Sequence, residues 1–297
     1  MSPTAELVRT DREHLIHPLH HPVDNANTVI YVRGRGVTVQ DIDGHEYLDG
    51  LSGLWNVNVG HGRAELAEAA AAQMKELAYF SGYVGASNIP AITLADRLIE
   101  IADNHMQAVF FTTGGAEANE SAFKTARFYW KARGKADKVK VIARHQGYHG
   151  LTLQAMSATA MGAAYWKMFE PRVPGFVHIQ TCYPYRYQGA KPGESVGQAA
   201  ARELEEAILR EGPDTVAAFI GEPIHGAGGV FYPTEDYWPL VREVCTRYDV
   251  LLIADEIITG FCRTGRWFAL EHWNVKPDMI SLRRASHPAI SRSAGSW

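Results

Sequence analysis

Two adjacent carboxylates, Asp255 and Glu256, follow directly after the five apolar residues Val250 to Ala254. Such a continuous apolar run indicates a strand buried on both faces of a parallel sheet. Ligands of open α/β sheets bind outside the carboxyl ends of the strands, so Asp255 stands where a carboxylate can face the cationic nitrogen of a ligand. On this stretch alone, the alternative that Asp255 only caps the segment after the strand stays open.

Polar and aromatic side chains follow two further apolar segments. Glu222 comes just after the predicted strand 216–220, and Tyr148 and His149 come after the predicted strand 139–143. Flat rings at a strand end can stack on a planar ligand, although a packed loop aromatic explains them equally well. These residues therefore extend the candidate site along one edge of the predicted sheet.

A glycine turn between a strand and a helix offers a place for an anion. The short apolar segment from Ala108 ends in Thr-Thr-Gly-Gly, and a long helix is predicted from Ala116 onward. Free N–H groups at a helix N-terminus bind anions. The spacing is neither GxGxxG nor a Walker loop, so a single phosphate suits it better than a dinucleotide or a nucleoside triphosphate. Turns of this kind without any ligand remain the alternative.

Helices must connect and cover these strands. Helical spacing is predicted over 63–77, after Pro90, from Ala116 and over 196–210, so that strands and helices alternate. This alternation predicts a doubly wound, mostly parallel sheet with helices on both faces and a site along one edge. Before it, residues 29–48 alternate apolar and polar side chains around the turn 41–44, which predicts an antiparallel meander.

Composition excludes several classes of protein. The chain has 297 residues, a net charge of −4 and no strong basic excess, which argues against a nucleic-acid partner. Three cysteines without CxxC spacing argue against a disulfide framework and a structural zinc site. No apolar run reaches membrane-spanning length and no signal peptide is recognisable, so a cytoplasmic protein without metal is expected.

Two stretches rich in histidine or in basic residues do not indicate a binding site. Residues 1–27 contain His14, His17, His20 and His21, but three prolines and no periodic apolar face predict a loosely ordered arm rather than a metal tract. The basic cluster between Lys131 and Lys140 predicts a solvated loop after a helix.

The segments TTGGAEANESAFKTAR, YHG, GEP and ADEIITGFCRTG, in this order and spacing, resemble the class III, ω-amino acid:pyruvate type aminotransferases. The glycine-rich segment LDGLSGLWNVNVGHG matches the same family upstream, and the resemblance runs from about Val29 to Ser281. It implies pyridoxal 5′-phosphate as cofactor and the type I fold. It also implies an N-terminal part of the small domain at 1–60, a large cofactor-binding domain at 61–297 and no C-terminal small domain.

The resemblance implies roles residue by residue. Gly115 and Ala116 occupy the phosphate-binding positions, although the family usually has a hydroxyl residue where this chain has Ala116. Tyr148 lies on the pyridine ring with His149 beside it, Asp255 pairs with the pyridinium nitrogen, and Glu222 orients this side of the pocket. A buried carboxylate keeps the ring nitrogen protonated, which makes the ring an electron sink. Trp55 and Phe80 line the substrate pocket, where Trp55 can equally be tucked under its own loop. Cys262 replaces a usual glycine before Arg263.

The lysine that forms the Schiff base in this family is missing. Matching the family text after Pro277 puts Arg284 at its position, and arginine stays protonated and cannot form an imine. Residues 285–297 lack apolar periodicity, yet a possible codon choice read one base earlier gives text close to the family's. The sequence therefore predicts a frameshifted, C-terminally truncated chain with little or no turnover.

The remaining expectations concern partners and the alternatives. The resemblance implies an amino donor, which is an ω-amino acid or amine, and a keto-acid acceptor such as pyruvate, with a homodimer in intact relatives. The alternative is a non-catalytic protein that binds pyridoxal 5′-phosphate. A Rossmann-type nucleotide enzyme is the weakest reading, because no GxGxxG is present.

Overall fold

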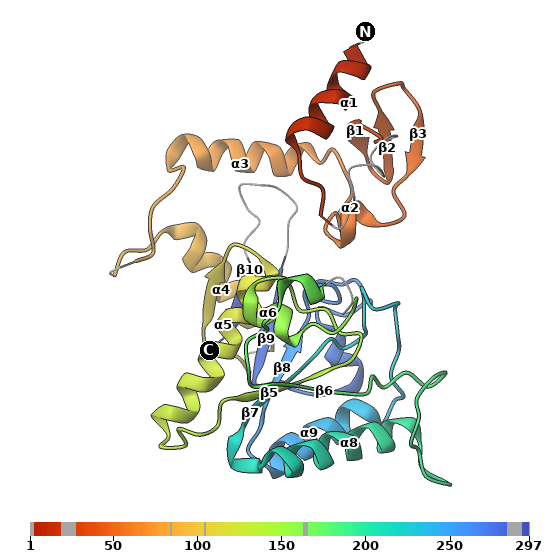
Figure 1. Cartoon of the computed structure of the whole chain (residues 1–297). Coiled ribbons are helices and arrows are strands. Elements are labelled where there is room, and N and C mark those ends of the chain that lie inside the picture. The colour runs from red at the N-terminus through yellow and green to blue at the C-terminus, as the bar shows by residue number, and fades with distance from the viewer. Residues whose placement is uncertain are drawn as a thin grey trace. The chain divides into compact units, whose positions relative to one another are not determined.

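The computed structural model describes residues 3–18, 28–83, 85–103, 105–162 and 166–283, and the backbone of residues 293–296. Within these residues the chain divides into two compact units, with the boundary between Ala78 and Tyr79 (Figure 1). The division into a small and a large domain at residue 60 stays a prediction.

The first unit contains α1 (Pro3–His14), β1 (Tyr31–Arg35), β2 (Thr38–Asp41), β3 (Glu46–Leu48), α2 (Ser52–Trp55) and α3 (Ala64–Glu76). The strands pair antiparallel in the order β1-β2-β3, which confirms the predicted meander. At its turn the Asp41 carboxylate accepts the backbone N–H groups of Asp43 and His45 at 3.0 and 2.8 Å. A short polar side chain thus closes the reversal of the chain.

The N-terminal arm is more ordered than its composition indicates. Predicting residues 1–27 as a loose arm was wrong for the first half, because α1 occupies Pro3–His14. Its support is local: Arg9 and Glu13 form an i,i+4 ion pair at 2.7 Å, and Pro3 is tolerated in the first turn. His17 bonds Asp11 at 3.0 Å, and His20 and His21 lie outside the described residues.

The second unit contains the larger sheet and its helices. Its elements are α4 (Ile89–Ile101), β4 (Val109–Thr112), α5 (Gly115–Ala132), β5 (Lys140–Arg144), α6 (Leu153–Ala158), β6 (Phe176–Ile179), α8 (Val196–Glu211), β7 (Val216–Gly221), α9 (Tyr237–Arg247), β8 (Leu251–Asp255), β9 (Met279–Ser281) and β10 (Ser293–Ser296). Short 3-10 turns cover Lys167–Phe169, Pro213–Thr215 and Ala269–Trp273.

The strand order in this sheet is β4-β10-β9-β8-β7-β5-β6. The pairs among β5 to β9 are parallel, and β10 runs antiparallel to both of its neighbours. The predicted doubly wound, mostly parallel sheet is therefore confirmed. Because β4, β5, β7, β8 and β9 all point the same way, the segments that follow them meet along one edge.

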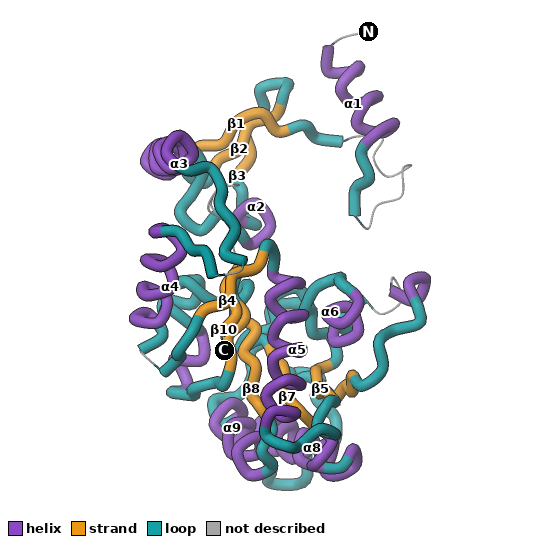
Figure 2. Tube along the Cα trace, turned by 90° about the vertical axis from the view of Figure 1, so that its left-hand side faces the viewer, coloured by secondary structure: helices purple, strands orange, loops and turns teal. Residues whose placement is uncertain are grey.

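Helices cover both faces of the sheet. Strand residues alternate in direction, so Ile142 and Leu252 belong to the apolar cluster under α8 and α9, whereas Val141 and Ile253 belong to the cluster under α5. Figures 1 and 2 show α8 and α9 together on one face and α5 with α6 on the other. The sheet is thus a rigid, two-sided core that fixes the positions of its edge loops.

Lys138 departs from the prediction of a solvated basic loop. It is only 1% exposed, although Lys131, Arg133 and Lys135 before it are exposed as expected. The Nζ atom donates to the carbonyl oxygens of Pro213, Val216, Tyr248 and Asp249 at 2.8–3.2 Å. It also lies 4.7 Å from the centre of the Trp130 ring. Lys138 therefore joins the amino ends of β5, β7 and β8.

Candidate functional site

The predicted site residues of the second unit meet at the carboxyl edge of its sheet. Asp255 ends β8, Glu222 follows β7, Tyr148 and His149 follow β5, and Gly115 begins α5 after β4. A Cβ placed on Gly115 would lie 2.8 Å from Ile257 Cδ1, so the start of α5 touches the segment that follows Asp255. The acid at the end of β8 and the glycine turn are neighbours.

Asp255 is buried and held by two side chains. It is 2% exposed, and its Oδ2 atom lies 2.8 Å from His149 Nδ1 and 2.8 Å from Asn119 Nδ2. Its Oδ1 atom accepts the backbone N–H of Ile257 at 3.2 Å. His149 Nδ1 must carry a proton to donate to a carboxylate, which fixes the tautomer of a neutral ring. Burying a carboxylate without hydrogen-bond donors destabilises the folded state, so Asp255 requires these donors.

Sequence reasoning missed Asn119. The residue lies on the buried face of α5, in step with Phe123 and Ala126, and is fully buried. Its Nδ2 atom also donates to the His149 carbonyl at 2.8 Å. The available signal was a polar residue at helical spacing within an apolar face, four residues after the glycine turn.

Glu222 braces the loops rather than contacting Asp255. Its two carboxylate oxygens accept the backbone N–H groups of Tyr148 at 3.0 Å and of Gly226 at 2.9 Å. Burial raises the pKa of Glu222, and the charge of Asp255 adds to this rise, whereas His149 opposes it. Glu222 thus ties the loop after β5 to the loop after β7.

Tyr148 and His149 have different surroundings, although they are adjacent. Tyr148 is half-buried, and burial raises the pKa of its phenol, while Arg283 opposes the rise. His149 is 2% exposed, with its ring against Asp255. Tyr148 is therefore the ring with a face available for stacking, and His149 acts on Asp255.

The start of α5 closely approaches the loop after His149. Gly150 has φ +120°, and a Cβ placed on it would lie 2.5 Å from Ala116 Cβ. A Cβ placed on Gly114 would meet nothing within 4 Å. The first N–H groups of a helix have no partner within the backbone of that helix. At this end of α5 the Glu117 carboxylate accepts the N–H of Thr113 at 2.8 Å and also bonds the backbone of Gly114, so the candidate anion donors are the N–H groups of Gly115 and Ala116.

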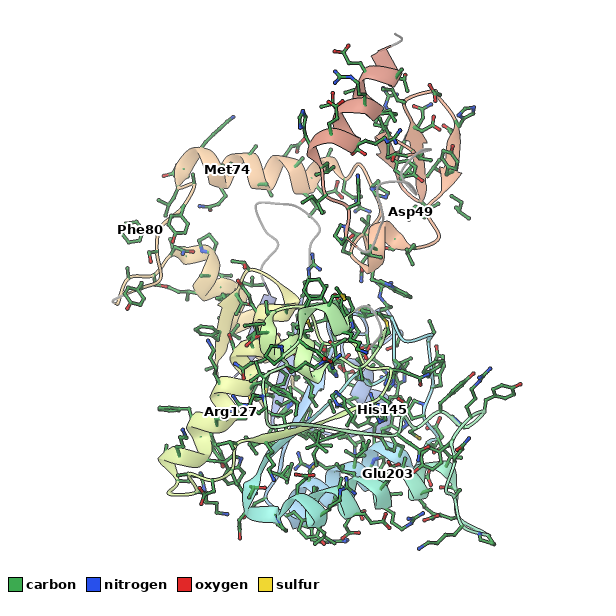
Figure 3. The ribbon with its side chains drawn as sticks, viewed as in Figure 1. Asp49, Met74, Phe80, Arg127, His145 and Glu203 are labelled. Carbon is green, nitrogen blue, oxygen red and sulfur yellow. The ribbon has the colours of Figure 1, made fainter. Side chains whose placement is uncertain are left out.

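The two predicted substrate-pocket residues belong to different units of the chain. Trp55 belongs to the first unit, at the end of α2, whereas Phe80 belongs to the second. Phe80 is 56% exposed on the connection between α3 and α4 (Figure 3). Their role in a substrate pocket stays a prediction. Arg284 lies outside the described residues, three positions after the end of β9.

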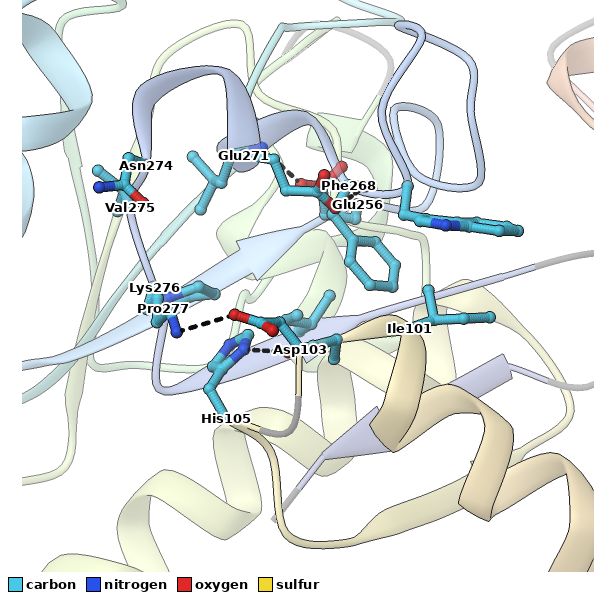
Figure 4. A pocket seen from close by; sticks show the side chains of 14 residues that line it. Ile101, Asp103, His105, Glu256, Phe268, Glu271, Asn274, Val275, Lys276 and Pro277 are labelled. Atoms are coloured by element: carbon cyan, nitrogen blue, oxygen red, sulfur yellow. Dashed lines mark hydrogen bonds and ion pairs between the residues drawn. The ribbon is translucent and has the colours of Figure 1, made fainter.

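Glu256 faces a separate pocket of about 240 Å³, which it helps to line (Figure 4). Phe268, Glu271 and His105 are among its lining residues, as are Asp103 and Lys276, which form an ion pair at 3.3 Å. The Glu256 carboxylate accepts a hydrogen bond from Thr259 and the backbone N–H of Leu270. Burial raises the pKa of Glu256 from 4.5 to about 7, and the charge of Asp255 contributes.

Glu256 should make stability fall as the pH rises. Between about pH 4.5 and about pH 7 the unfolded chain releases this proton while the folded chain keeps it, so the free energy of unfolding falls by up to about 3 kcal/mol. Above that range the loss is complete. We expect Glu256→Gln to abolish this fall, measured by urea unfolding at about pH 5 and about pH 8. An equal fall in the variant would contradict the assignment.

The donor set at the carboxyl edge suits one kind of ligand. It combines a buried carboxylate for a cationic ring nitrogen, a half-buried ring, and the first helical N–H groups of α5 at Gly115 and Ala116. These residues fit a phosphorylated pyridine such as pyridoxal 5′-phosphate. Among the described residues, no group of three His, Cys, Asp or Glu side chains lies close enough to hold a metal ion.

Comparisons with known proteins find aminotransferases over nearly the whole chain. A putrescine–pyruvate aminotransferase of Pseudomonas aeruginosa is 39% identical over 283 residues, which are 95% of this chain and 62% of that protein. A diaminobutyrate–2-oxoglutarate transaminase of Halomonas elongata is 39% identical over 99% of this chain and 64% of that protein. The chain thus spans less than two thirds of the length of these curated relatives.

Solved structures give the same result for the fold. An (S)-enantioselective omega-transaminase from Thermomicrobium roseum superposes with a TM-score of 0.93 at 44% identity, over 98% of this chain and 66% of that one. This confirms the predicted type I fold of pyridoxal-phosphate-dependent transferases. In the part of the chain that is described, no helix is long and apolar enough to span a membrane. The family model for class III aminotransferases matches residues 20–286, and the chain therefore belongs to this family.

Proposed function

We propose that the carboxyl edge of the sheet binds pyridoxal 5′-phosphate, and that the site belongs to an aminotransferase. The observation that carries the proposal is the buried Asp255 carboxylate, held by His149 and Asn119 next to the start of α5. When bound, the cofactor supplies an electron sink for the carbon that loses its proton.

Each residue has a defined task in this proposal. Asp255 holds a proton at the ring nitrogen, because an opposite charge in a buried site favours the cationic form. The N-terminal turn of α5, at Gly115 and Ala116, binds the phosphate through backbone donors, without the hydroxyl that the family usually has at the position of Ala116. Tyr148 covers the ring, and Glu222 keeps the loop of Tyr148 in place.

The reaction proposed for the whole protein moves an amino group from an ω-amino acid or amine to pyruvate or a similar keto acid. Relatives named for putrescine with pyruvate and for diaminobutyrate with 2-oxoglutarate support this substrate class. The chain with Arg284 should bind the cofactor without turning over, because a guanidinium that stays protonated cannot attach to it. We also propose a homodimer and a cytoplasmic location.

The test separates binding from catalysis. We expect the chain to take up pyridoxal 5′-phosphate with a change in its visible absorbance, to release it on dialysis after borohydride treatment, and to transfer no amino group from putrescine to pyruvate. In an Arg284→Lys variant, borohydride should fix the cofactor on the new side chain, as mass spectrometry would detect. Absence of any cofactor binding would refute the proposal. Fixation on a native lysine with turnover would refute the inactivity.

A further inference from the structure

We propose that Asn119 is a positioning residue for Asp255: together with His149 it holds Oδ2, which leaves Oδ1 as the oxygen that meets a cationic ring nitrogen. The inference rests on the proposed function and concerns which atom of Asp255 is used. Asn119 lies on α5, His149 after β5 and Asp255 at the end of β8, so three elements meet in one carboxylate.

The orientation of the Asn119 amide is determined by its neighbours. Nδ2 lies 2.8 Å from the His149 carbonyl and 2.8 Å from Asp255 Oδ2. Both atoms are acceptors, so a flipped amide would direct its oxygen at two oxygens. Oδ1 of Asn119 is buried and has no hydrogen-bond partner among the described residues. The side chain therefore acts here as a double donor.

The two carboxylate oxygens of Asp255 therefore differ in the hydrogen bonds that they accept. Oδ2 takes hydrogen bonds from a side-chain amide and an imidazole, each at 2.8 Å, whereas Oδ1 takes one backbone N–H at 3.2 Å. A carboxylate has about four acceptor positions, two on each oxygen. Oδ2 is saturated, and Oδ1 keeps acceptor capacity for a charge-assisted bond.

Asn119 is needed because His149 alone does not fix the carboxylate. The χ2 torsion of aspartate is broad and two-fold, so one donor can follow either oxygen. A second donor on another element, in the fully buried core of α5, locks the rotation. Loss of Asn119 should then weaken the contact to the ring nitrogen specifically, and leave phosphate binding at Gly115 and Ala116 intact.

The experiment compares two ligands on one protein: pyridoxal 5′-phosphate and its 1-deaza analogue, in which carbon replaces the ring nitrogen. In Asn119→Leu, which keeps the volume and removes both donors, we expect pyridoxal 5′-phosphate to bind about tenfold more weakly, with no change for the analogue. Asn119→Asp, which sets a second carboxylate against Asp255, should show a larger loss of the same kind.

The ratio of the two dissociation constants separates positioning from folding, because partial misfolding weakens both ligands alike. Equal weakening of both ligands, or of neither, overturns the role of Asn119. If Asn119→Leu does not fold, the smaller Asn119→Ser variant is measured in the same way. Failure of the proposed function looks different, since the unaltered chain would then bind neither ligand or bind both equally.

Discussion

Replacing Asp255 by alanine is expected to weaken binding of pyridoxal 5′-phosphate by about 100-fold. The carboxylate is 2% exposed, and removing one partner of a buried, hydrogen-bonded charge pair costs about 2–5 kcal/mol. At about 1.4 kcal/mol per tenfold change, the lower half of that range gives this factor. Fluorescence titration with the cofactor measures it directly.

The same strand provides a control for Asp255→Ala. Asp249 lies just before β8, at the opposite end of the strand, and forms an exposed ion pair with Lys135 at 2.7 Å. Asp249→Ala should leave cofactor affinity unchanged, because exposed charges at that distance are screened by salt. If both variants lost cofactor affinity to a similar extent, or if Asp255→Ala lost none, the contact between Asp255 and the ring nitrogen would be refuted.

Replacing Lys138 by methionine is expected to lower the free energy of unfolding by about 3 kcal/mol. Methionine preserves most of the packing against Trp130 but leaves the carbonyl groups of Pro213, Tyr248 and Asp249 without the ammonium donor. Buried polar groups that lose their partner cost about 1–3 kcal/mol each, and part of that cost is relieved by water. Urea unfolding of the two proteins measures the difference.

Lys135 is the matched control. Its Nζ atom also lies near the Trp130 ring, at 5.0 Å, and it forms the exposed pair with Asp249. Lys135→Met should change stability by less than about 1 kcal/mol, since exposed ion pairs contribute little. Equal effects at positions 135 and 138 would mean that stability depends on the ring contact and not on the buried carbonyl groups.

The sheet and the strand ends could be predicted from the sequence because their signals are local. The apolar runs before Glu222 and Asp255 are continuous, and their carboxyl ends must share one edge once the strands are parallel. The sequence does not predict strand β6 and helix α9. Strand β6 is a four-residue edge strand with a histidine, His178, and too short to show a period.

Burial of polar residues could not be read from the sequence. Lys138 looks like its exposed neighbours, and only the meeting of three strand ends places carbonyl groups around it. The burial of Asn119 could not be predicted either, because its hydrogen-bond partners lie 30 and 136 residues away along the chain. Helix α1 shows the reverse mismatch: the composition of residues 1–27 indicates no regular structure, yet Pro3–His14 is helical and includes an i,i+4 ion pair between Arg9 and Glu13.

The contact between Ala116 and Gly150 limits how this protein can change. No side chain fits at position 150, since its Cβ would lie 2.5 Å from the Ala116 Cβ and 2.7 Å from the Ala116 Cα, and the φ of +120° also favours glycine. Position 150 must therefore stay glycine whichever residue stands at position 116. A mutant library that introduces a hydroxyl residue at position 116 should keep position 150 as glycine. If position 150 were randomised too, most variants would contain a steric clash.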